Sequence, residues 1–85
     1  MEKLFRVNIL TSGEKIFEGE ASSLIVPAAL GYLGVLANHA PLIAATKSGR
    51  ITLKDASGAT KTFIAEAGGF LQVMHNQATI LLDSA

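Results

Sequence analysis

Two histidines, His39 and His75, carry the side chains of this sequence that titrate nearest neutral pH, so they are the first candidates for acid–base or metal chemistry. A metal site needs several His, Cys or carboxylate ligands at workable spacing, and no such cluster surrounds either residue. His75 has the context of an exposed turn residue. His39 stands between Asn38 and the Ala40-Pro41 pair, so its ring either caps groups of its own loop or contacts a partner protein.

The sequence also does not indicate a site for nucleophilic or acid–base catalysis. A serine nucleophile needs an adjacent base that a third group orients, and the serines of this chain stand in turns or at strand edges. Glu18, Glu20 and Glu66 are candidates for a general acid–base pair, but nothing in their spacing places two of them in one cleft. We therefore expect a protein that is not an enzyme, with no catalytic residue, no cofactor and no metal.

Glycine runs are the next candidates, because such runs can cradle phosphate groups. The Gly31-x-x-Gly34 and Gly68-Gly69 runs lack the full glycine spacing and the following Lys-Ser/Thr of a phosphate loop. Their expected role is conformational: a positive φ at a turn, or the close approach of another stretch of chain.

The composition excludes nucleic acid and points to a protein partner. Seven basic and seven acidic residues are scattered along the chain, so there is no basic stripe to displace counterions from nucleic acid. With 85 residues there is room for one domain, residues 1–85, and 49% of them are hydrophobic while only 16% are charged. A domain of this size cannot bury all of that apolar surface, so part of it should form a patch for a partner.

The elements that position these residues are β-strands, because apolar residues recur at every second position and no long window has helical periodicity. Short strands separated by turn residues favour an antiparallel β-sandwich or barrel. Pro27 should end a strand or mark an edge, and a single helical turn at most is expected over 27–30. The expected strands are 4–11, 15–20, 22–27, 50–54, 60–66, 70–74 and 78–83.

Two aromatic residues are expected on the surface. If Leu71 and Val73 face the core, then Phe70 and Gln72 face outward, since neighbouring strand residues point to opposite faces. Tyr32 lies between glycines and is expected at a loop tip. Exposed aromatic residues are common hot spots of protein interfaces, although Phe70 could instead cover a second layer of the sandwich.

Seven segments in order along the chain resemble the epsilon subunit of the rotary F-type ATP synthase. The glycine-rich run combined with the later Gly-Gly-Phe-Leu is the most specific part of the resemblance. The segments are Val7–Thr11 with the glycine turn after it, Lys15–Glu20, Gly31–Leu36, Asn38–Leu42, Lys47–Gly49 with Ile51, Gly68–Val73, and Asn76 through Leu82-Asp83-Ser84-Ala85.

The resemblance implies an all-β fold, a flattened antiparallel β-sandwich of roughly ten short strands. It also implies a rotor subunit that holds the gamma subunit of the central stalk to the ring of c subunits. Because the sequence starts at Met1 and shows no targeting segment, a bacterial or plastid-encoded origin is expected. The expected location is the cytoplasmic side of the bacterial plasma membrane, peripheral to it. The isolated domain should be a folded monomer. The positions that correspond to the ring-facing loop are Gly31, Tyr32 and Leu33. Those of the gamma-facing surface are Thr11, His39, Gly69, Phe70 and Gln72.

The chain departs from the family pattern in two ways. The family often has Glu at the position of Tyr32 and Pro at that of Ala37, so an aromatic packing contact is expected in place of a carboxylate contact with the ring. The usual family member also continues into a helical hairpin that can inhibit ATP hydrolysis and in some members binds ATP. The sequence ends where this hairpin would begin, as a natural short form or a shortened chain, and neither activity is expected of these 85 residues.

Two other functions compete with the rotor subunit. A generic β-sandwich adaptor outside the ATP synthase would use the same apolar patch, but it would not associate with the rotor. An enzyme or small-molecule receptor would need a concave pocket with convergent polar groups, and the sequence supplies no such set.

Overall fold

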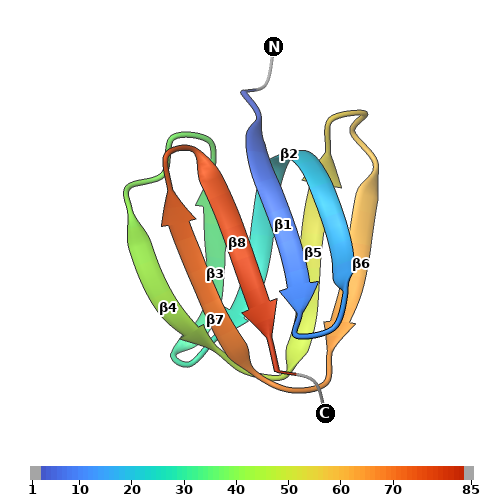
Figure 1. Cartoon of the computed structure of the whole chain (residues 1–85). Helices are drawn as coiled ribbons and strands as arrows, with labels where there is room; N and C mark the ends of the chain where they lie inside the picture. The colour runs from blue at the N-terminus through green and yellow to red at the C-terminus, as the bar shows by residue number, and fades with distance from the viewer. Residues whose placement is uncertain (1–2, 84–85) are drawn as a thin grey trace.

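Eight β-strands account for most of residues 3–83, the part of the chain that this computed structural model describes (Figure 1). Ser84 and Ala85, which belong to the last segment of the resemblance, lie outside the described residues. The strands are β1 (Phe5–Thr11), β2 (Lys15–Ala28), β3 (Gly31–Leu36), β4 (Leu42–Thr46), β5 (Gly49–Asp55), β6 (Thr60–Ala65), β7 (Gly69–Met74) and β8 (Gln77–Leu82).

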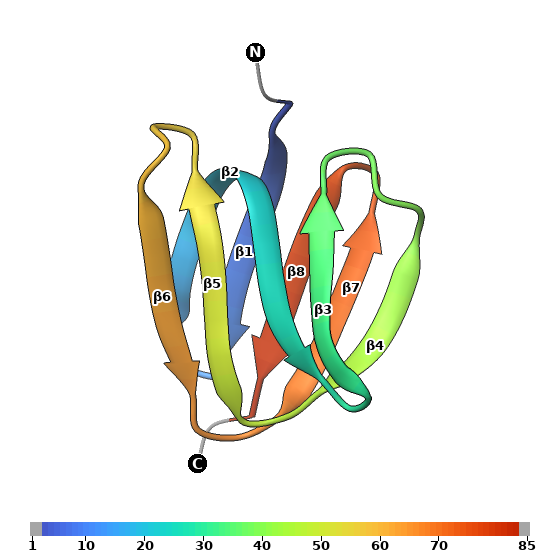
Figure 2. The ribbon, with the colours of Figure 1, turned by 180° about the vertical axis from the view of Figure 1, so that it is seen from behind.

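The strands form two layers that share one long strand (Figures 1 and 2). One layer contains β4, β7, β8, β1 and the first half of β2, and the other contains β3, the second half of β2, β5 and β6. The 14-residue β2 rises in the first layer, arches over at the top of both views and descends in the second. Its register with β5 shifts between Ala21 and Ser23. An irregularity of this kind bends a strand locally, and β2 passes from one layer to the other there.

The predicted fold class is confirmed, with two corrections. The sandwich has eight strands rather than about ten, partly because 15–20 and 22–27 form one continuous strand. The ladder is antiparallel except for β1 and β8, which run parallel from Arg6↔Gln77 to Thr11↔Leu82. Between Pro27 and Leu30 the chain makes a β-turn instead of a helical turn, and β2 ends at Ala28, one residue after the proline.

The core lies between the layers and is built from the inward half of each strand. The alternation predicted for β1, β5 and β7 is confirmed, since each of these strands buries every second side chain. This burial is the main favourable term in the stability of the fold. The buried hydrophobic residues are Phe5, Val7, Ile9, Ala21, Leu24, Val26, Val35, Ile51, Leu53, Ala65, Leu71, Val73, Ala78, Ile80 and Leu82.

Two strands were not predicted, and Tyr32 lies in one of them. β3 pairs with β2 from Gly31↔Ala28 to Leu36↔Ser23, so Tyr32 is a strand residue and not part of a loop tip. The tip of this hairpin is formed by Ala29 and Leu30 instead. β3 and β4 escaped prediction because their outward residues are glycine or apolar as well, which hides the alternation.

One side of the sandwich is closed by aromatic side chains. Phe17 of β2 and Phe63 of β6 come from the two edge strands that face each other there, and their ring centroids lie 5.6 Å apart at an interplanar angle of 53°. The Nζ of Lys61 lies 5.6 Å from the Phe17 ring centroid, a cation–π arrangement. These contacts hold the β6 edge to the β2 edge without backbone pairing.

Candidate partner-binding surfaces

The histidines take local roles. Nδ1 of His39 lies 2.7 Å from the carbonyl oxygen of Ala40, and because a carbonyl only accepts, this nitrogen donates the hydrogen bond. The ring therefore caps its own loop, one of the two roles left open by the sequence. His75 is exposed in the turn between β7 and β8, with a φ of 52°. Within residues 3–83 no group of three or more His, Cys, Asp or Glu could hold a metal ion.

The candidate carboxylates do not form a catalytic pair. Glu18 is held at 2.7 Å by both Lys15 and Arg6, and hydrogen bonds from Lys15 first and Arg6 second lower the pKa of its carboxyl group. Glu20 lies opposite Arg6 in the β1–β2 ladder. Glu66 directly follows β6, in the other layer. Glu18 is thus the partner of two surface cations, whereas among residues 3–83 no ion pair joins Glu20 or Glu66 to a cation.

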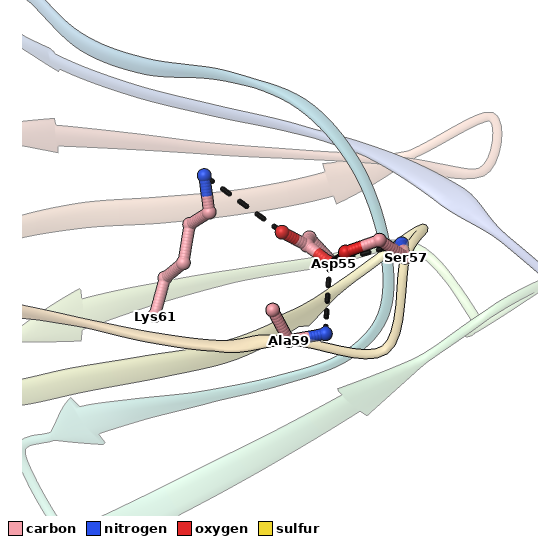
Figure 3. Close-up of polar contacts among 4 residues, drawn as sticks. All are labelled: Asp55, Ser57, Ala59 and Lys61. Atoms are coloured by element: carbon pink, nitrogen blue, oxygen red, sulfur yellow. Dashed lines mark hydrogen bonds and ion pairs between the residues drawn. The ribbon is translucent and has the colours of Figure 1, made fainter.

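Asp55 organises the turn between β5 and β6 (Figure 3). Its Oδ1 accepts hydrogen bonds from the Ser57 hydroxyl at 2.6 Å, the Ser57 amide at 2.9 Å and the Ala59 amide at 3.0 Å. The Nζ of Lys61 lies 3.7 Å from Oδ2. The Ser57 hydroxyl is the main cause that lowers the pKa of Asp55 below its ordinary 3.8, with smaller contributions from the two amides and Lys61, while desolvation opposes them.

Replacing Asp55 by Asn should remove part of the acid sensitivity of the fold. A carboxyl group whose pKa is lower in the folded state stabilises the fold above its unfolded pKa, and this contribution disappears as the pH falls through the folded pKa. The excess stability of the wild type over Asp55→Asn should thus be largest above about pH 5 and shrink below the ordinary value of 3.8. Urea denaturation of both proteins at a series of pH values measures it. Parallel pH curves would contradict the prediction.

One exposed apolar surface is the outer face of the β4–β7–β8–β1 layer, called the outer face below. Phe70 lies between Ala45 of β4 and Leu81 of β8, and Gln72 lies between Ile43 and Thr79. The exposed fractions are 72% for Ile43, 59% for Phe70, 50% for Leu81 and 40% for Met74. Adjacent exposed large hydrophobic residues of this kind mark a surface that a partner covers.

A polar hollow borders this apolar surface. It has a volume of about 190 Å³ and lies at the β7–β8 turn. Its lining residues are Gln72, Met74, His75, Gln77 and Thr79. An apolar centre with a polar rim is the usual composition of a protein interface.

Three of the five residues predicted to face a stalk subunit lie together. Gly69, Phe70 and Gln72 are on β7, and the outward orientation predicted for Phe70 and Gln72 is confirmed. Thr11 ends β1 near Gly69, since both pair with Leu82, but its hydroxyl accepts a hydrogen bond from the Glu14 amide at 3.2 Å. His39 belongs to the connection between β3 and β4, which lies at the opposite end of the layer from the end of β1 (Figure 1).

The three residues predicted to face the ring lie at the end of the molecule where β2 meets β3. The Tyr32 side chain is 63% exposed on the outer side of its layer, as predicted, whereas Leu33 points inward and packs against the core. Gly31 has a φ of 129°, which glycine adopts readily and other residues avoid. Leu30, which sequence reasoning missed, is fully exposed at the tip of the turn.

Comparison with known proteins identifies the class of this sandwich. The sequence model of the family described as "ATP synthase, Delta/Epsilon chain, beta-sandwich domain" matches residues 4–85. The chain therefore belongs to the delta/epsilon family of ATP synthase subunits.

Within this family, the curated relatives that match the chain are ATP synthase epsilon chains. The chain is 40% identical over 85 residues to the ATP synthase epsilon chain of Latilactobacillus sakei subsp. sakei (strain 23K), covering 99% of this chain and 59% of the relative. The epsilon chain of Herminiimonas arsenicoxydans is 38% identical over 85 residues, which cover 100% of this chain and 61% of that relative. The chain thus spans about 60% of the length of these relatives. It spans 92% of the epsilon chain of Chlorobaculum tepidum, at 40% identity over 82 residues and 96% of this chain.

Solved structures support the fold. A chain in the Euglena gracilis mitochondrial ATP synthase structure (OSCP/F1/c-ring in rotational state 1) superposes with a TM-score of 0.82 and 19% identity, covering 89% of this chain and 48% of that one. A chain in the central stalk/c-ring structure of the Tetrahymena thermophila mitochondrial ATP synthase superposes with a TM-score of 0.77 and 14% identity. The match covers 98% of this chain and 66% of that one. Within the described residues, no helix is long and apolar enough to cross a membrane.

Proposed function

We propose that residues 1–85 form the rotor-binding domain of an epsilon-type subunit, a non-catalytic coupler between the gamma subunit and the c-ring. Family membership and the exposed apolar outer face support this proposal together. The coupler would act at the cytoplasmic side of the bacterial plasma membrane, bound through the complex and not through its own membrane span. Its task is to transmit ion-driven rotation to the catalytic head without slipping.

The outer face is the proposed gamma-binding surface, and this exposed apolar face is the observation that carries the proposal. Phe70 lies near its centre, and completing the burial of such a side chain stabilises a complex by about 2 kcal/mol. Gly69 and Gln72 flank Phe70 on β7, and Thr11 and His39 lie at the two ends of the layer as rim contacts. Gly31, Tyr32 and Leu33 mark the end proposed to face the c-ring.

Binding of the gamma subunit from the same organism tests the function. We expect the wild-type chain to bind gamma as a monomer, and Phe70→Ala to raise the Kd about 30-fold, typical of a central aromatic residue. Leu36→Ala is the matched control, because Leu36 is 63% exposed but lies on the second layer. Isothermal titration calorimetry measures binding, and urea denaturation checks that both variants keep their stability.

Two outcomes would overturn the proposal. A wild-type chain that does not bind gamma would remove the rotor role and favour a generic β-sandwich adaptor outside the ATP synthase. Equal losses for Phe70→Ala and Leu36→Ala would show that the outer face is not the gamma-binding surface.

A further inference from the structure

Three chain segments meet at one end of the outer face. They are the start of β1, the connection between β3 and β4, and the turn between β7 and β8 (Figure 1). One hydrogen bond joins the β7–β8 turn to the β3–β4 connection across 38 positions of the sequence. Another joins the same turn to the residue before β1 across 72 positions. Both hydrogen bonds involve one residue of the turn, Asn76.

The side chain and backbone of Asn76 together hold these segments. Its Oδ1 accepts a hydrogen bond from the Asn38 amide at 2.7 Å, and its Nδ2 donates to the Leu4 carbonyl oxygen at 3.0 Å. The partners fix the orientation of the side-chain amide, because a backbone amide only donates and a carbonyl oxygen only accepts. The Asn76 carbonyl oxygen accepts a third hydrogen bond from the Arg6 amide at 3.1 Å. These three hydrogen bonds are called the Asn76 clamp.

The clamp coincides with costly backbone conformations. Within residues 3–83, the residues other than glycine with a positive φ are Asn38 at 62°, His75 at 52° and Asn76 at 59°. Left-handed conformations cost free energy for residues with a Cβ, and they persist where surrounding contacts hold them. Because such conformations cluster at functional sites, this corner of the outer face is a candidate binding site.

The residue that this corner presents is His39, which directly follows Asn38. Its connection also contains two local hydrogen bonds, from the His39 amide to the Leu36 carbonyl oxygen at 3.3 Å and from Nδ1 to the Ala40 carbonyl oxygen at 2.7 Å. Because Nδ1 donates, Nε2 is the acceptor nitrogen of the neutral ring. Nε2 forms no hydrogen bond with any residue that the structure describes, so it is available to a donor on a partner.

We infer that Asn76 is a positioning residue for gamma binding. Its Oδ1 holds the Asn38 amide, and thereby holds His39 where Nε2 accepts a hydrogen bond from a donor group of gamma. A loop that is ordered before binding loses less conformational entropy in the complex, which strengthens binding. The inference rests on the proposed function, which assigns His39 to the rim of the gamma-binding surface.

The turn by itself does not require an asparagine side chain. His75 and Asn76 are its two central residues, since Met74 pairs with Gln77, and both have a positive φ. Glycine is favoured at the second central position of such turns. Asn76→Gly thus keeps the turn and removes both side-chain hydrogen bonds. Asn76→Asp keeps the acceptor for the Asn38 amide and loses only the donor to Leu4.

Hydrogen exchange of the Asn38 amide, followed by NMR in the free chain, tests the clamp without gamma. Exchange should be about tenfold faster in Asn76→Gly than in the wild type, because the acceptor is absent. In Asn76→Asp it should stay within about twofold of the wild type, since a carboxylate oxygen also accepts. Equal exchange in Asn76→Gly and the wild type would overturn the inference.

Isothermal titration calorimetry with gamma from the same organism tests the positioning role. His39→Ala and Asn76→Gly should each raise the Kd about fivefold, whereas Asn76→Asp should stay within about twofold of the wild type. If Asn76 acts through His39, the double variant should also show about a fivefold loss, not about a 25-fold one. Ser57→Gly is the matched control, because it removes a side-chain hydrogen bond of 2.6 Å from the β5–β6 turn in the other layer. It should change the Kd less than about twofold.

The contrary outcomes are distinguishable. If the wild type does not bind gamma, the proposed function and the inference fail together. If the wild type binds but Asn76→Gly binds equally well, or the losses of the two single variants multiply in the double variant, the inference fails and the proposed function stands. The same holds if Asn76→Asp loses as much affinity as Asn76→Gly. Urea denaturation checks that the variants are folded, and Asn76→Asp carries the binding test if Asn76→Gly is not.

Discussion

Gly69→Ala is expected to lower the free energy of unfolding by about 3–5 kcal/mol, at the upper end of single substitutions. A Cβ at this position would overlap the carbonyl oxygen of Leu81 and lie 2.9 Å from the Cα of Leu82. Both are backbone atoms of the paired strand β8, so they cannot move aside as a flexible side chain does. A chain of 85 residues has a total stability of only about 4–13 kcal/mol, so this loss is large.

Urea denaturation followed by circular dichroism measures the effect, and Gly34→Ala supplies the control. No atom lies within 4 Å of a Cβ built on Gly34, which is also a strand residue. Because glycine within a strand costs about 0.5–1 kcal/mol relative to alanine, this control should be neutral or slightly more stable. A Gly69→Ala protein as stable as the wild type would show that β7 and β8 are not as close as described.

Leu24→Ala is expected to lower the free energy of unfolding by about 2–5 kcal/mol. The Leu24 side chain is fully buried in the second half of β2, where its backbone pairs with Val35 on one side and Leu53 on the other. Truncation removes apolar contacts and leaves a cavity that three paired strands cannot close.

Ile25→Ala is the matched comparison for this prediction. Ile25 is the next residue of the same strand, but its side chain is 44% exposed on the outer side of the layer. Its truncation should cost about 1 kcal/mol or less. Thermal or urea unfolding of the two variants measures the difference, and equal losses would contradict the assignment of inward and outward faces in β2.

Period-two alternation predicted β1, in which polar residues separate the buried apolar ones. β1 alternates Phe5, Val7 and Ile9 with polar residues, and its burial follows that pattern. β3 and β4 were missed because residues such as Ile43 stay apolar although they face solvent. The parallel pairing of β1 with β8 joins residues about seventy positions apart, and no local pattern encodes such a contact.

The candidate surfaces were predictable to a similar extent. Because neighbouring strand residues point to opposite faces, the sequence predicted that Phe70 and Gln72 face outward, and the structure confirms this. The neighbours that turn Phe70 into a patch, Ile43 and Leu81, come from other strands and depend on register. A hollow lined by Tyr32, Gly49, Arg50, Thr52 and Ile64 likewise depends on the register that pairs β5 with β6.

The arch of β2 has a mechanical consequence. Two sheets that touch only through apolar side chains can shear past each other, because dispersion contacts have little directional preference. Here one covalent strand is hydrogen-bonded to β1 in one sheet and to β3 and β5 in the other. A load applied at Phe70 therefore reaches Arg50 through backbone bonds, and the two sheets respond as one stiff body along the 38 Å length of the molecule.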